Sequence, residues 1–315
     1  MKKLIPAVVL LAAVGAAQAQ VTVYGLIDMS YGKNIADDAA GVRADFHSGG
    51  DAGSSQGNST TRIGVKGTAD VGKGYKGNFQ LESGGITSNG SVGAAGSPFF
   101  ARQAWVGLSA GFGEVRLGTQ DSVPFQTMVG FDFNGAANAA SAQGNVAAAP
   151  WMTGRQERSL QYISPSMSGF KAQVGFVPRG TVVGAEATTS LGLSYAAGKL
   201  TVAATAESKR TTVGDSFGSV AASYDFGAAK VMAAYANAGT NMKGTSLGVV
   251  APVAGFNIGM NYTKNSDTQA VGTEFYVNRE IFKNTYGYLD FGNVDKTTAT
   301  SLKGSAYAVG VIYTF

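Results

Sequence analysis

The chain has 315 residues, a formal net charge of +4 and a mean hydropathy of +0.05. Only 14% of the residues are charged and none is cysteine, which excludes a disulfide framework, a thiolate nucleophile and a cysteine-ligated metal. The small, dispersed charge excludes a nucleic-acid-binding footprint, and the average polarity is too high for a bundle of membrane helices.

Residues 1–19 have the pattern of a secretory signal peptide. Lys2 and Lys3 provide the positive start, residues 4–16 form an apolar run, and residues 17–19 read Ala-Gln-Ala, a cleavage motif. The apolar run is too short to cross about 30 Å of hydrocarbon as an anchor. We therefore expect a mature domain of residues 20–315, whose net charge is +2 once two lysines leave a precursor of +4.

From Val21 onward the chain repeats segments of alternating apolar and polar or small residues, separated by glycine-rich punctuation. In the last segment the residues of one parity are Tyr307, Val309, Val311, Tyr313 and Phe315, and those of the other begin with Ala306, Ala308 and Gly310. Aromatic residues that bracket aliphatic ones on a single face are typical of the lipid-facing band of a membrane β-barrel. The pattern predicts an all-β, transmembrane, antiparallel β-barrel.

The connections between these segments fall into two length classes. We expect tight turns at residues 71–74, 111–113, 166–169, 197–199, 227–229, 253–255 and 282–284. We expect mostly longer loops at residues 36–58, 88–98, 121–154, 179–187, 209–215, 239–242, 265–267 and 295–302. Short turns at one rim and long loops at the other are typical of outer-membrane barrels, and seven turns with eight loops predict about sixteen strands.

The third long loop, residues 121–154, shows no sustained period of two or of 3.6. Irregular segments of more than about 15 residues are uncommon in compact domains and are usually functional or disordered. Disorder favours charge and few aromatic residues, whereas this loop has little charge and contains Phe125, Phe131, Phe133 and Trp151. We therefore predict that the loop folds into the lumen of the barrel.

Several segments together resemble the Gram-negative trimeric porins of the betaproteobacterial type. They are residues 20–28 (QVTVYGLID), 61–67 (TRIGVKG), 79–83 (FQLES), 102–109 (RQAWVGLS), 112–118 (FGEVRLG), 161–165 (QYISP) and the terminal Phe315. The resemblance covers essentially the whole mature chain and implies a sixteen-stranded barrel, a homotrimer and a constricting third loop. It also implies a location in the lipid of the outer membrane, passive diffusion of inorganic ions and small hydrophilic solutes, and no cofactor.

Porins of this type line the constriction with wall arginines that face carboxylates on or near the third loop. By motif position, the residues that the resemblance assigns to the pore constriction are Arg62, Arg102, Arg155, Glu82, Asp121 and Asp132. The simpler alternative is that the arginines are only solvated lumen residues. The second half of the loop, residues 135–149, consists mostly of Ala, Asn, Gly and Ser and leaves the pore width open.

Alternation supports part of this assignment. Arg62 shares a strand face with Lys66, and Arg155 shares one with Glu157, whereas Arg158 has the other parity. In the fourth segment we expect Arg102 and Ala104 to face the lumen, with Trp105 on the opposite face. The polar Gln103 has the same parity as Trp105 and would therefore face lipid. A polar side chain would be tolerated there if that face made a contact with another subunit.

The sequence predicts a modest preference for anions. The candidate inward bases are Arg62, Lys66, Arg102, Arg116 and Arg155, and the candidate acids are Asp28, Glu82, Glu114, Asp121, Asp132 and Glu157. The positive and negative charges of these two sets nearly cancel, so the positions of the charges decide the ion selectivity. Because three arginines converge on one wall and cannot lose their charge, we expect the local field there to attract anions.

The sequence also bears on three other functions. An enzyme would need an acid/base set, and the single histidine, His47, lies near Asp45 and Asp51 without a third partner, so we expect no enzymatic activity. A substrate-specific channel is the main alternative, because the third loop contains aromatic residues. A structural or adhesive barrel with a plugged lumen is disfavoured by the inward Gly and Ala residues of the last segment.

Overall fold

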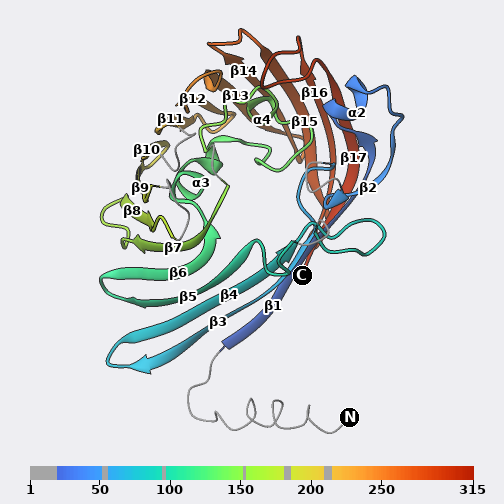
Figure 1. Ribbon diagram of the computed structural model, residues 1–315. Coiled ribbons are helices and arrows are strands. Elements are labelled where there is room, and N and C mark those ends of the chain that lie inside the picture. Colours follow the sequence, from blue (N-terminus) through green and yellow to red (C-terminus); the bar gives the residue numbers. More distant parts are fainter. Residues whose placement is uncertain (1–19, 52–55, 94–96, 152–153, 181–185, 209–214) are drawn as a thin grey trace, which may run out of the picture.

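The computed structural model describes residues 20–51, 56–93, 97–151, 154–180, 186–208 and 215–315; the predicted signal peptide lies outside these residues. The strands form one closed antiparallel ring (Figure 1). Closure occurs at the first strand, β1 (Gln20–Lys33), which pairs with β3 (Arg62–Gly72) on one side and β17 (Gly304–Thr314) on the other. No helix of these residues is long and apolar enough to span a membrane.

Within the described residues, sixteen strands make up the wall, which confirms the predicted fold class. Besides β1, β3 and β17, they are β4 (Tyr75–Gly84), β5 (Gln103–Ala110), β6 (Gly113–Asp121), β7 (Arg155–Ile163), β8 (Phe170–Val177), β9 (Thr188–Ala197), β10 (Leu200–Glu207), β11 (Phe217–Asp225), β12 (Lys230–Asn237), β13 (Lys243–Val253), β14 (Phe256–Asn265), β15 (Val271–Phe282) and β16 (Thr285–Val294). An additional short strand, β2 (Asp45–Ser48), belongs to the first loop and pairs with one end of β1.

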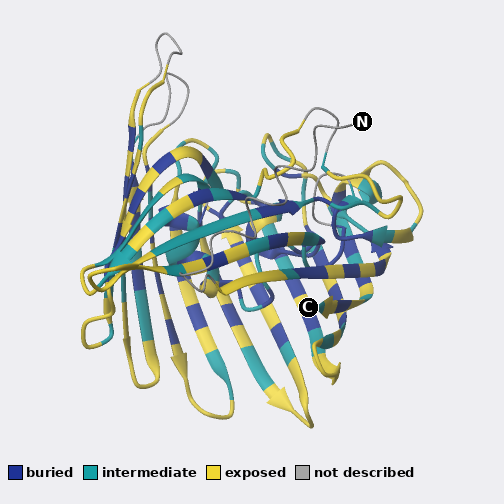
Figure 2. Ribbon diagram, turned by 90° about the horizontal axis from the view of Figure 1, so that it is seen from below, coloured by how far each residue is buried: buried dark blue, intermediate teal, exposed yellow. Residues whose placement is uncertain are grey.

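The hairpin turns gather at one end of the barrel, and the longer loops lie at the other (Figure 2). In the turn between β3 and β4, Lys73 and Gly74 both have positive φ, at 55° and 77°. Two successive positive φ angles define the tight turn whose twist matches that of the paired strands. All seven predicted turns fall between consecutive wall strands.

Alternation sets the two faces of the wall. On β17, Val309 and Val311 are exposed on the outer face, whereas Ala306 and Ala308 are fully buried on the inner face. The inner face is identified by its contacts, because inward residues such as Glu274 on β15 hydrogen-bond to the third loop. Exposed aliphatic and aromatic side chains on the outer face form the band expected to meet lipid.

On β5 the faces are the reverse of the prediction. Gln80 of β4 pairs with Trp105 and Glu82 pairs with Gln103, so Trp105 and Gln103 are the residues that face the lumen. Arg102 precedes β5 in a bend, where strand alternation does not apply. The expectation that Gln103 faces lipid at a subunit contact is therefore wrong: its side chain accepts a hydrogen bond from Trp105 Nε1 inside the barrel.

β7 contains a second departure from simple alternation. Its register against β6 shifts between Gly118 and Gln120, and Arg158 has a φ of +52°. A bulge of this kind inserts an unpaired residue and reverses which face the following side chains occupy. Consequently Gln156 is buried while Glu157 is exposed, and the parity that grouped Arg155 with Glu157 does not hold.

The third loop forms three short helices that lie inside the ring in Figure 1: α3 (Val123–Met128), η2 (Val129–Phe131) and α4 (Ala142–Asn145). Ser122 caps α3 by accepting a hydrogen bond from the Phe125 amide, which satisfies an N–H that a helix end leaves without a partner. α3 contacts β8, β9 and β10, η2 contacts β11 and β12, and α4 contacts β14, β15 and β16. The loop therefore follows the inner wall over much of its circumference.

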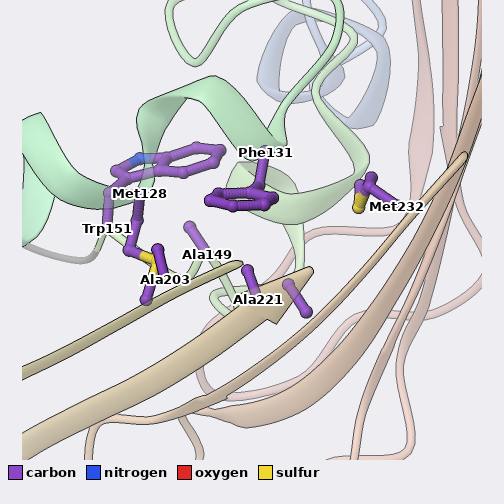
Figure 3. Packing of buried hydrophobic residues seen from close by; sticks show 8 residues of the cluster. Met128, Phe131, Ala149, Trp151, Ala203, Ala221 and Met232 are labelled. Carbon is purple, nitrogen blue, oxygen red and sulfur yellow. The ribbon is translucent and has the colours of Figure 1, made fainter. Parts of the chain in front are cut away.

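The start and the end of this loop are held by a cluster of apolar side chains (Figure 3). The loop contributes Met128, Phe131, Ala149 and Trp151, and the wall contributes Ala203, Ala221, Met232 and Ala234. The small wall residues leave room for the large loop residues at this face. Burial of side chains as large as these typically contributes about 1.5–3 kcal/mol each, so the cluster anchors the loop.

The alanine-rich second half packs by close backbone approach. A Cβ atom on Gly292 of β16 would lie 2.5 Å from Ala140 O, and one on Gly272 of β15 would lie 2.6 Å from Ala142 O. Ala139, Val146 and Ala148 are buried in the same contact. Small residues on both sides therefore give this segment a defined position, although it has no large side chain to anchor it.

Candidate functional site

Five predicted site residues lie at the loop-side ends of neighbouring strands. Arg62 begins β3, Glu82 lies near the end of β4, Arg102 directly precedes β5, Asp121 ends β6 and Arg155 begins β7. Consecutive antiparallel strands bring alternate starts and ends to the same edge of a sheet. The chain order therefore brings three bases and two acids together on one stretch of wall.

Two ion pairs organise this row. Arg102 Nε lies 2.5 Å from Glu82 Oε1, and Arg155 Nε lies 3.4 Å from Asp121 Oδ1. Tyr24 of β1 donates a hydrogen bond of 2.8 Å to the second oxygen of Glu82. Each oxygen of Glu82 thus has a partner, and its negative charge is matched by Arg102.

Arg62 differs from the other two arginines. Its Nη1 donates to Thr60 O at 3.1 Å and to Ser59 Oγ at 3.3 Å, both uncharged acceptors. Among the described residues no carboxylate lies within ion-pair distance of it. Three arginines and two carboxylates leave this row with one excess positive charge, which Arg62 supplies.

The row faces the third loop across an open space of about 800 Å³. The wall side of this space includes Arg62, Glu82, Arg102, Asp121 and Arg155, and the loop side includes Phe125, Gln126, Asn134, Ala136 and Trp151. The described loop residues that line it are uncharged apart from Asp121 at its start. The arginines therefore face neutral polar and apolar groups.

Asp132 lies elsewhere. It is buried in the contact between the loop and the opposite wall, where it accepts hydrogen bonds from Asn134 N and Ser141 Oγ. Burial, followed by the nearby Glu274 carboxylate, raises the pKa of the Asp132 carboxyl, in the loop, to about 8. Asp132 does not line the space that the arginines face.

Asn134 and Asn58 join the neighbouring acids into one network. The Asn134 amide donates to Glu274 Oε1 at 2.8 Å and to Asp290 Oδ1 at 3.1 Å. The Asn58 amide in the first loop donates to Asp290 Oδ2 at 2.9 Å. The two loops are thus bound to the same wall carboxylates, a connection that strand alternation alone does not reveal.

Asp28 lies at a further part of this network, away from the arginine row. Its carboxylate accepts hydrogen bonds from Ser59 N at 2.7 Å, Asn58 N at 2.8 Å and Tyr288 Oη at 2.6 Å. The side chain is fully buried. Asp28 therefore holds the end of the first loop against the wall and does not face the open space.

A second group of lumen residues lies closer to the tight turns and was partly missed. The Arg116 guanidinium lies 4.2 Å from the Trp105 ring centroid and ion-pairs with Glu114 at 2.7 Å. Lys66 Nζ lies 5.0 Å from the Tyr24 ring. A continuation of the lumen, of about 500 Å³, is lined by Lys66, Trp105, Glu114 and Arg116 among others. The sequence prediction missed Trp105 on this face, because the parity taken from Arg102 placed its side chain on the outside of the barrel.

The described residues contain no cluster of three or more His, Cys, Asp or Glu side chains suited to a metal ion. His47 lies 3.8 Å from Asp51 in the first loop, and neither residue lines the space that the arginines face. The site thus consists of fixed charges and open space, which can attract, exclude or orient a passing solute.

Comparison with known proteins identifies this arrangement. The family model of Gram-negative porins matches residues 7–296. The chain belongs to the Gram-negative porin family. It is 33% identical to outer membrane porin protein 32 of Delftia acidovorans, over 99% of this chain and 95% of the relative. It is also 32% identical to an outer membrane porin protein of Bordetella pertussis, over 75% of this chain and 69% of the relative.

A solved porin agrees in fold. The anion-selective porin from Comamonas acidovorans superposes with a TM-score of 0.75 at 25% identity, covering 95% of this chain and all of that one. Membership of the family makes this porin an outer-membrane channel for diffusion and not an enzyme. The predicted family, location and absence of catalysis are confirmed.

Proposed function

We propose that this porin passes ions and small hydrophilic solutes with a modest preference for anions, and that the arginine row opposite the third loop sets this preference. The observation that carries the proposal is the unpaired charge of Arg62 beside two neutralised pairs. The loop side of the 800 Å³ space offers no carboxylate beyond Asp121 to offset it. The similar porin from Comamonas acidovorans is described as anion-selective, which supports a preference for anions in this porin.

The third loop then acts as the constriction, because it occupies part of the lumen at the height of the arginine row. A substrate-specific channel is the second candidate. Phe131, one of the aromatic residues that suggested it, is buried against the wall, whereas Phe125 and Trp151 contribute to the open space. Fewer aromatic side chains are thus free to form a track for a solute, which favours general diffusion.

We also propose a cleaved signal peptide and a homotrimer. The sequence pattern of residues 1–19 supports the first. The second rests on the likeness to trimeric porins, since Gln103 no longer provides a separate reason for it.

The Arg62→Gln variant tests the selectivity proposal. By Coulomb's law a unit charge about 8 Å from an ion in water contributes about 0.5 kcal/mol, and salt reduces this further. We therefore expect the chloride-to-potassium permeability ratio to fall about twofold, measured as a shift of the reversal potential under a potassium chloride gradient.

The matched control is the double variant Glu82→Gln/Arg102→Gln, which removes an ion pair and leaves the net charge of the row unchanged. Its permeability ratio should stay close to that of the parent. If the control shifts the ratio as much as Arg62→Gln does, then local geometry and not net charge sets the selectivity.

A further inference from the structure

An apolar groove lies on the outer face of the barrel, toward the end that carries the tight turns. It encloses about 420 Å³. Its outer-face lining consists of Phe256 on β14, Val277, Arg279 and Ile281 on β15, and Gly287 and Leu289 on β16. Because this face meets the membrane, the groove is open to lipid.

The register fixes which side chains point outward. Arg279 pairs with Gly287 and is out of phase with Glu274 and Tyr276, which are buried on the lumen side. Gly287 leaves the base of the groove empty. A Cβ added there would have Ile281 Cγ2 at 3.5 Å as its nearest neighbour, an ordinary van der Waals contact.

Arg279 gives this groove a charge. Its guanidinium lies 4.7 Å from the Phe256 ring centroid, and the side chain is exposed. Two other hollows of the outer face, of about 540 and 390 Å³, are lined by no charged residue in the described part of the chain. The groove at β14–β16 differs from these two in having a cation beside its apolar lining.

The height of Arg279 on the wall suits a lipid headgroup. It precedes Lys283, the first residue of the turn, by four residues, which at 3.3 Å per residue is about 13 Å along the strand. A lipid-facing arginine costs about 2–4 kcal/mol at the bilayer midplane but only about 0–1 kcal/mol near the interface. At the interface its N–H groups can form paired hydrogen bonds with a phosphate.

We propose that this groove binds a glycerophospholipid of the periplasmic leaflet. The phosphodiester contacts the Arg279 guanidinium, which Phe256 holds in place, and one acyl chain runs over Gly287 between Ile281 and Leu289. The charge favours this occupant over the apolar face of a second subunit, since burial of an unpaired cation in a protein contact is costly.

Two variants of the mature barrel test the charged part and the apolar part of the site separately. Arg279→Gln removes the charge, and Gly287→Leu fills the groove without a backbone clash. Binding of phosphatidylglycerol to the folded protein in detergent is measured by native mass spectrometry, and a photoreactive phosphatidylglycerol locates the contact. We expect each variant to weaken binding about tenfold, and crosslinks in the parent to map to β14–β16.

Matched controls are Lys264→Gln, which removes an exposed outward cation at the loop end of β14, and Gly218→Leu, which fills an outer hollow that has no cation. Both should bind phosphatidylglycerol like the parent, and all four variants should retain the parent conductance. Equal binding by Arg279→Gln and the parent would overturn the proposal. So would crosslinks between subunits at the groove that exclude the lipid.

Discussion

Asp132 is surrounded by other carboxyl groups at the contact between the third loop and the wall. The charge of Glu274 acts on it, and Asp290 shares the Asn134 amide with Glu274. The folded protein holds a proton on Asp132 up to a pKa of about 8, whereas the unfolded value is 3.8. The contribution of protonated Asp132 to the free energy of unfolding is therefore complete below about pH 4 and is lost as the pH rises through 8.

This linkage gives a testable pH dependence. The midpoint temperature of unfolding should fall as the pH is raised from 4 to 9, and Asp132→Asn, which keeps a neutral side chain of the same shape, should flatten the fall. A variant with the same pH profile as the parent would show that Asp132 does not contribute to it. Ser122→Ala is a suitable control, because it removes a helix cap from the same loop without removing a carboxyl group.

At the scale of elements, the third loop owes its position to small residues on the wall. Gly292 of β16 leaves no room for a side chain, since its Cβ would lie 2.5 Å from Ala140 O. Ordinary contact requires about 1 Å more, so Gly292→Val should displace the loop toward the arginine row and lower the single-channel conductance.

Gly287→Val on the same strand is the control for this variant, because its side chain points outward and would meet Ile281 at an ordinary van der Waals distance of 3.5 Å. It should leave the conductance unchanged. A parent-like conductance for Gly292→Val in a correctly folded barrel would mean that the loop position does not limit the flow.

Much of the strand arrangement could be predicted, because turn residues and period-two alternation are local properties. The faces of β5 could not, since Arg102 lies in a bend just outside the strand and gave the wrong parity to Gln103 and Trp105. The bulge at Arg158 likewise breaks the pattern in β7. Local irregularities of this kind depend on pairing with neighbouring strands, which a single sequence does not display.

The arginine row was predicted as a set because its members occupy positions in segments that resemble those of trimeric porins. The place of Asp132 could not be predicted, since it depends on contacts with Glu274 and Asn261 more than a hundred residues away. The alanines of the loop also did not indicate that this segment packs closely on the wall. A small side chain indicates close packing only when the glycine opposite it is known.

For the whole molecule, the last residue, Phe315, extends the pairing of β17 with β1 that closes the barrel. Phe315 exchanges backbone hydrogen bonds with Gly25 of β1, at 2.9 and 3.1 Å, and its ring covers this glycine. Deletion of Phe315 removes two bonds worth about 1 kcal/mol each together with the ring contact. We expect a lower yield of folded barrel, seen as less of the fast-migrating form in unheated gel electrophoresis, whereas Phe315→Tyr should fold normally. Normal folding of the truncated chain would contradict this role.

The sign of the ion selectivity tests the central claim most directly. The row of Arg62, Arg102 and Arg155 has one more charge than its two carboxylates can neutralise, and the loop acid Asp132 is buried away from it. Under a potassium chloride gradient, the reversal potential of the wild-type channel in a planar bilayer should therefore have the sign that indicates chloride preference. A reversal potential of the opposite sign, indicating potassium preference, would contradict the account.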